Sequence, residues 1–188
     1  MRYIILFFLI MVLFVSMPVK AETNLISNPG FEEMEVGANQ EDAKDWNEWA
    51  GKRSDLYSHS GQWSLNSWGA DTTGDCGAWQ GDIPVTPGER VVFTAYLMSP
   101  NETGIGRSPL AGKAEAFIEI EWRGTEPLQS VESNHLTDTT NGEWKQYSVS
   151  GVAPQGTIAA RFVCKVINVL GSRGDVYFDD LKAEIFSE

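Results

Sequence analysis

The chain has 188 residues, of which 42% are hydrophobic, 11% aromatic and 21% charged. This hydrophobic content excludes intrinsic disorder, and the two cysteines exclude both a disulfide-dense small scaffold and a cysteine-rich zinc domain. The 26 Asp and Glu residues outnumber the 14 Lys and Arg residues, for a formal net charge of −12, which argues against a surface for nucleic acid or anionic membrane.

The first predicted element is a secretory signal over residues 1–21. Arg2 gives a positive start, residues 3–15 form an uninterrupted apolar run, and Val19 and Ala21 supply residues that suit a cleavage site. The run is shorter than the roughly 20 residues of a membrane-spanning helix, although an uncleaved anchor is the alternative. We therefore expect a secreted mature domain, extracellular or periplasmic, over residues 22–188, with no membrane insertion after cleavage.

The mature chain shows the two-residue alternation of half-buried β-strands. In residues 90–98, for example, Val91, Phe93, Ala95 and Leu97 share one side. Strands are predicted over 64–68, 78–83, 90–98, 115–122, 129–134, 144–149, 157–166 and 175–185. Turn sequences such as those at 28–30 and 86–88 separate them, and 101–113 is predicted to be a long loop suited to binding. About ten short strands indicate one all-β sandwich domain.

Catalytic signatures are missing from the sequence. It contains no G-x-S-x-G, no H-E-x-x-H and no phosphate-binding Gly-Lys-Ser/Thr loop. The histidines, His59 and His135, stand alone, and Glu119 and Glu121 lie two apart on one strand face, where a solvated pair is commoner than a glycosidase pair. We therefore expect a protein that is not an enzyme. A disulfide between Cys76 and Cys164 is left open.

Six segments in order resemble a known family. They are the opening at 24–32, Trp46, the segment 59–65 (HSGQWSL), the segment 80–88 that ends in VTPG, the segment 144–154, and the closing 174–181 (GDVYFDDL). Together they resemble the CenC-like carbohydrate-binding modules of the galactose-binding-like superfamily. The resemblance implies a jelly-roll β-sandwich of two antiparallel sheets, and a non-catalytic module that binds polysaccharide or oligosaccharide.

The resemblance also implies a structural Ca²⁺ held by Glu32 and Asp179, where the first and last strands meet. Ca²⁺ takes six to eight oxygen ligands, and Asn28, Gly30 and the turn at 58–62 are candidate sources of the others. The alternative is that both carboxylates cap turns or face water.

The predicted glycan site consists of aromatic and polar side chains on outward strand positions. Sugar rings stack on Trp and Tyr, and their hydroxyls pair with charged and amide groups. The predicted residues are Trp68, Trp79, Tyr96, Glu119 and Arg161, with Trp49 a further platform candidate; Trp46, Trp63, Trp122 and Trp144 are assigned to packing. The alternatives are side chains that cover the sheet without binding, an exported surface or matrix protein that contacts cell-surface proteins, and a small hydrolase or lyase.

Overall fold

The computed structural model describes residues 23–37, 40–68, 74–106, 114–126, 128–167 and 174–187. The predicted signal at 1–21 and the second half of the predicted loop at 101–113 lie outside these ranges. Within them, no helix is long and apolar enough to cross a membrane.

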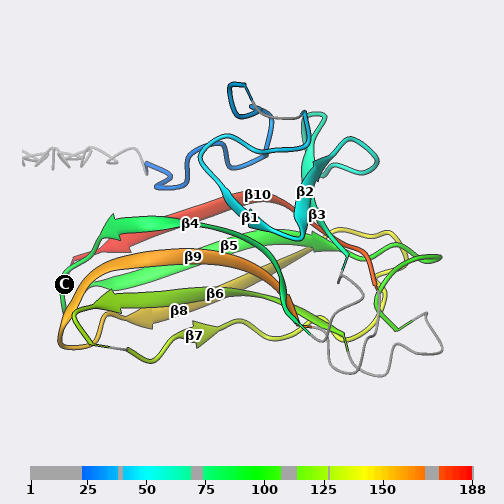
Figure 1. Cartoon of the computed structure of the whole chain (residues 1–188). Helices are drawn as coiled ribbons and strands as arrows, with labels where there is room; N and C mark the ends of the chain where they lie inside the picture. The colour runs from blue at the N-terminus through cyan, green and yellow to red at the C-terminus, as the bar shows by residue number, and fades with distance from the viewer. Residues whose placement is uncertain are drawn as a thin grey trace, which may run out of the picture.

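The described residues form ten β-strands in two antiparallel five-stranded sheets, which confirms the predicted all-β sandwich. The first sheet has the order β1-β4-β9-β6-β7 and the second β2-β3-β10-β5-β8. Figure 1 shows β4, β9 and β6 running side by side along the molecule. The strands are β1 (Asn47–Trp49), β2 (Gly51–Ser54), β3 (Ser64–Ser67), β4 (Cys76–Pro84), β5 (Arg90–Met98), β6 (Glu115–Gly124), β7 (Val131–Glu132), β8 (Lys145–Val152), β9 (Thr157–Ile167) and β10 (Val176–Phe186).

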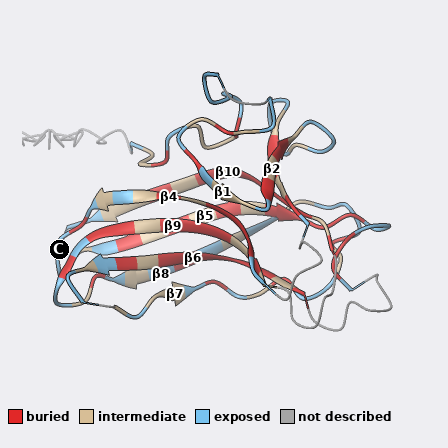
Figure 2. Ribbon diagram, viewed as in Figure 1, coloured by how far each residue is buried: buried red, intermediate tan, exposed pale blue. Residues whose placement is uncertain are grey.

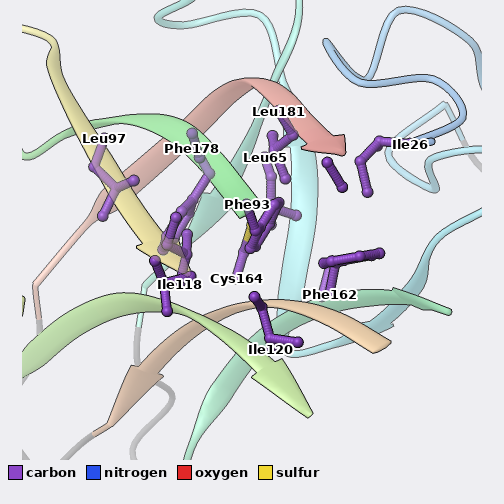
Figure 3. Close-up of a cluster of buried hydrophobic side chains, with 14 of the residues drawn as sticks. Ile26, Leu65, Phe93, Leu97, Ile118, Ile120, Phe162, Cys164, Phe178 and Leu181 are labelled. Atoms are coloured by element: carbon purple, nitrogen blue, oxygen red, sulfur yellow. The ribbon is translucent and has the colours of Figure 1, made fainter. Parts of the chain in front are cut away.

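The core lies between the two sheets and is built from the predicted alternation. Val91, Phe93, Ala95 and Leu97 of β5 are all fully buried, and Phe93 meets Phe162 of the opposite sheet with ring centroids 5.1 Å apart (Figure 3). Burial of each such aromatic side chain contributes about 1.5–3 kcal/mol. Figure 2 shows buried residues along the central strands β9 and β6 and more exposed ones on the edge strand β8.

The sequence pattern did not predict β1 and β2, which are only three and four residues long. The tryptophan assignments are partly corrected. Trp46 and Trp122 are buried in the core as expected, but Trp63 is half-buried and lies outside the core, because it directly follows an exposed turn.

The two cysteines lie on adjoining strands of the first sheet. Cys76 of β4 and Cys164 of β9 are both buried, and no disulfide joins them. Burial raises the pKa of the Cys164 thiol well above its usual value, so this thiol is held in its protonated form.

The two ends of the domain lie together, as the resemblance implies. The N–H of Leu25 donates to the carbonyl of Ala183, and the N–H of Leu181 donates to the carbonyl of Pro29, each at 3.0 Å. The Asn24 side chain adds hydrogen bonds to Leu181 and Ala183. This pairing along β10 brings the opening segment next to Asp179.

Candidate functional site

The outer face of the first sheet carries a row of aromatic and charged side chains. Trp79 of β4 lies opposite Val163 of β9, which in turn lies opposite Glu119 of β6. In the next row, Arg161 of β9 lies between Gly81 and Glu121. Their sequence neighbours on these strands point into the core, so these side chains project to the outside.

Arg161 is stacked on Trp79. The Cζ atom of its guanidinium lies 3.6 Å from the centre of the indole ring, an arrangement that is electrostatically favourable. Gly81 makes room for it, because a Cβ at this position would lie 2.7–2.8 Å from Cγ, Cα and Cβ of Arg161. The position of the Arg161 side chain over Trp79 therefore depends on the missing side chain at Gly81.

Two carboxylates lie near the guanidinium of Arg161, but neither is hydrogen-bonded to it. Its Nη atoms lie 3.6 Å from Asp82 and 3.7 Å from Glu121, beyond hydrogen-bond distance. Its Nε is buried and has no hydrogen-bond partner in the protein. This N–H donor, beside the indole ring of Trp79, is thus left unsatisfied by the protein.

Glu119 has a buried acceptor atom that is likewise without a hydrogen-bond partner. The residue is 4% exposed, and its Oε2 has no hydrogen-bond partner, with Lys165 Nζ 3.7 Å away. Burial raises the pKa of the Glu119 carboxyl above its usual value, against the opposing effects of a hydrogen bond with Ser130 and the charge of Lys165.

Two adjoining hollows lie on this face, and Glu121 lines both. The first has a volume of about 210 Å³ and is lined by Trp49, Trp79, Glu121, Arg161, Val163 and Lys165. The second has a volume of about 410 Å³ and is lined by residues that include Glu119, Glu121, Arg123, Glu126, Leu128 and Ser130. We refer to these two hollows together as the outer-face groove.

The structure brings three of the five predicted glycan-site residues together, namely Trp79, Glu119 and Arg161. Tyr96 lies on β5 of the other sheet, where it stacks on His59 with ring centroids 3.8 Å apart. Trp68 follows β3, is 38% exposed and does not line the outer-face groove.

Sequence reasoning left Val163 and Lys165 out of the site, and it named Trp49 only as a further candidate. All three line the first hollow. The outward positions of Val163 and Lys165 follow from the alternation of β9. The position of Trp49 depends on β1, which is too short for a pattern.

The side chains of Glu32 and Asp179 both lie close to Gly30. A Cβ at Gly30 would be 3.4 Å from Asp179 Oδ1 and 3.7 Å from Glu32 Cγ. Asp179 Oδ2 accepts hydrogen bonds from the backbone N–H groups of His59 and Ser60, at 2.7 and 3.1 Å. Glu32 Oε1 accepts from the next two donors of the same turn, the N–H groups of residues 62 and 63, at 2.9 and 3.0 Å.

Both carboxylates thus cap the turn that contains residues 59–63, which is the alternative to a Ca²⁺ site, and carboxylate oxygens are also the kind of ligand that Ca²⁺ takes. Asp179 is fully buried, and burial raises the pKa of its carboxyl to about 6, so a cation would stabilise its charged form. In the described ranges, no group of three or more His, Cys, Asp or Glu side chains could hold a metal. The remaining oxygens that Ca²⁺ needs would come from backbone carbonyls and water.

No protein-family model matches the sequence, and no curated protein matches it. Solved structures do match in fold. The CBM22-1 xylan-binding domain from Paenibacillus barcinonensis Xyn10C is 16% identical over 90% of this chain and 98% of its own, with a TM-score of 0.61. TmCBM61, solved with β-1,4-galactotriose, is 17% identical over 88% and 99%, with a TM-score of 0.53.

Enzymes share this fold. A Stig cyclase from Fischerella sp. TAU is 16% identical over 87% of this chain and 96% of its own, with a TM-score of 0.59. The enzymatically active domain of a bacteriophage CBA120 tailspike is 12% identical with a TM-score of 0.58, and this chain spans 21% of its length. The chain thus has the fold of carbohydrate-binding modules, and this fold alone does not separate a binding module from an enzyme.

Proposed function

We propose that the protein is a secreted, non-catalytic carbohydrate-binding module that binds a polysaccharide or oligosaccharide in the outer-face groove. The observation that carries the proposal is the Trp79–Arg161 stack beside Glu119, with a buried donor and a buried acceptor that the protein itself leaves unpartnered. The similarity in fold to xylan-binding and galactotriose-bound modules supports the choice of a carbohydrate ligand.

The chemistry of a sugar fits these groups. The C–H face of a pyranose ring packs on an indole, and a hydroxyl both donates and accepts hydrogen bonds. Glu119 Oε2 and Arg161 Nε are an unsatisfied acceptor and donor, and sugar hydroxyls would pair with them once the side chains that cover these atoms move aside on binding. Each bond would satisfy a buried group that otherwise carries a desolvation penalty.

The acidic residues of the groove suit binding better than hydrolysis. Glycosidases place two carboxyl groups on either side of the scissile bond. Glu119 and Glu121 instead project from one strand face, and each lies near a cation, Lys165 and Arg161 respectively. A hydrolase or lyase would be recognised by sugar products released from the polymer.

The proposal includes a structural Ca²⁺ at Glu32 and Asp179. These carboxylates would hold the ion, and its charge would stabilise the buried Asp179 carboxylate and join the opening segment to β10. The expected secretion agrees with this, since the apolar run at 3–15 predicts export.

Affinity electrophoresis in gels that contain xylan, soluble β-glucan or mannan tests the function. We expect retardation by at least one polymer, its loss in Trp79→Ala, and its retention in the control Trp68→Ala, whose ring lies outside the groove. If Trp68→Ala abolished the retardation and Trp79→Ala did not, the binding site would lie outside the outer-face groove. Absence of retardation by every polymer, with a cell-surface protein captured instead, would favour the surface-protein alternative.

A further inference from the structure

A third hollow lies away from the outer-face groove, beside the end of β2 and the turn that precedes β3. Its volume is about 540 Å³, within the range of small-ligand sites. It shares no residue with the groove. The lining residues are Gln40, Glu41, Arg53, Ser54, Asp55, Leu56 and Trp63. β2 and β3 belong to the second sheet, whereas the strands that form the outer-face groove belong to the first.

Trp63 is the aromatic platform of this hollow, and Arg53 holds it in place. The Arg53 Cζ atom lies 4.0 Å from the centre of the Trp63 indole. The backbone N–H of Trp63 is bonded to Glu32, so both the main chain and the ring are fixed. The ring is half-buried, which leaves part of it for contact with a ligand that needs no reorganisation of the site.

The guanidinium of Arg53 is already hydrogen-bonded to backbone carbonyls of the protein. The residue is 5% exposed, and its Nε, Nη1 and Nη2 donate to the backbone carbonyls of Phe31, Gln40 and Glu32 at 2.6, 2.7 and 3.0 Å. None of the other lining residues is a cation, and two are acids, Glu41 and Asp55. An anionic ligand such as phosphate, sulfate or a uronate would therefore be repelled.

The remaining groups suit a neutral polyol. Glu41, Asp55, Gln40 and Ser54 line the same hollow as Trp63, and the 72% exposed Leu56 adds apolar surface to it. A sugar ring has an apolar C–H face and a rim of hydroxyl groups, so it is complementary to a flat apolar patch surrounded by hydrogen-bonding groups.

We propose that this hollow is a second carbohydrate-binding site, which binds a neutral sugar unit on Trp63 independently of the outer-face groove. The inference rests on the proposed function for the choice of ligand. Two sites on one domain would bind a single long polymer, or two neighbouring chains, with an avidity of about 10²-fold or more over either site alone. A short oligosaccharide would show no such gain.

The test uses ¹⁹F NMR of the full domain labelled with 5-fluorotryptophan and titrated with oligosaccharides from xylan, β-glucan and mannan. The Trp63 and Trp79 resonances are assigned by their loss in Trp63→Phe and Trp79→Phe, and the half-buried Trp144 serves as an internal control. We expect both assigned resonances to shift with a glycan, and the Trp63 resonance to shift equally in a Trp79→Ala background.

The outcomes separate the two proposals. A Trp63 resonance that stays fixed while that of Trp79 moves would overturn the second site and leave the groove. Movement of Trp63 alone would support the second site and contradict the groove. If neither resonance moves with any glycan, both proposals are wrong. Thermal unfolding of Trp63→Phe checks that the variant is folded.

Discussion

Replacement of Glu119 by Gln is expected to stabilise the domain at neutral pH while weakening glycan binding. The Glu119 carboxylate is buried, with one oxygen unpartnered and a pKa raised by burial. Burial penalises a charged carboxylate more than the neutral amide of Gln, and Lys165 at 3.7 Å offsets part of this penalty. We therefore expect a gain of about 1 kcal/mol at pH 7, or about 2–4 °C in Tm.

The pH dependence gives the sign of the effect. Because the native Glu119 binds its proton more tightly than the unfolded chain does, the free energy of unfolding falls as the pH rises from about 4.5, the ordinary value, through the native pKa. The stabilising effect of Glu119→Gln should therefore be present at pH 7 and shrink as the pH approaches 4.5. Differential scanning calorimetry across this range, with affinity electrophoresis at pH 7, measures both properties.

A matched control is Glu121→Gln, two positions along the same face, where the carboxylate is about a third exposed. It should change Tm much less than Glu119→Gln does. A Glu119→Gln domain that unfolds at a lower temperature than wild type at pH 7, or a difference that does not vary with pH, would refute the reasoning. Undiminished glycan binding in Glu119→Gln would remove this residue from the site.

Three further perturbations test other parts of the structure. Excess Ca²⁺ should raise Tm, because Ca²⁺ at 100 times its dissociation constant adds about 2.7 kcal/mol to the free energy of unfolding. A chelator or the substitution Asp179→Asn should abolish this rise. A Tm that does not change with Ca²⁺ would exclude the ion. Gly81→Ala should displace Arg161 from Trp79, cost about 1–3 kcal/mol in urea unfolding and weaken glycan retardation. Arg53→Met removes three hydrogen bonds to carbonyls and should cost about 3 kcal/mol; a loss below 1 kcal/mol would show that solvent replaces them.

The long strands could be predicted because one face of each is buried. β5 alternates between buried and more exposed residues from Arg90 to Leu97, and the inward positions of β6 and β9 repeat every second residue within longer buried stretches, so a slip by one residue would move the inward apolar set to the other face. β1 and β2 have too few residues for such a pattern, and they form because β4 and β3 offer edges for pairing.

The composition of the proposed glycan site was harder to predict, because the alternation of a strand shows which side chains face outward but not which sheet the strand belongs to. Tyr96 and Arg161 both occupy outward positions, yet β5 and β9 belong to opposite layers of the sandwich. Only the pairing order of the strands shows that Trp79, Arg161 and Glu119 share a face. The stacking of Arg161 on Trp79 further depends on the missing side chain at Gly81, a contact between distant segments.

The outer face of the first sheet carries two buried charged side chains with a polar atom that the protein does not satisfy. Six buried side-chain polar atoms in the described residues have no hydrogen-bond partner. Three belong to charged side chains, and one of these, Glu184 Oε1, lies 2.9 Å from Lys182 Nζ. The other two, Glu119 Oε2 and Arg161 Nε, belong to side chains whose nearest opposite charges lie 3.6–3.7 Å away, and both lie on this face. Such departures concentrate at functional sites, and a hydroxyl-rich ligand would satisfy the donor and the acceptor together.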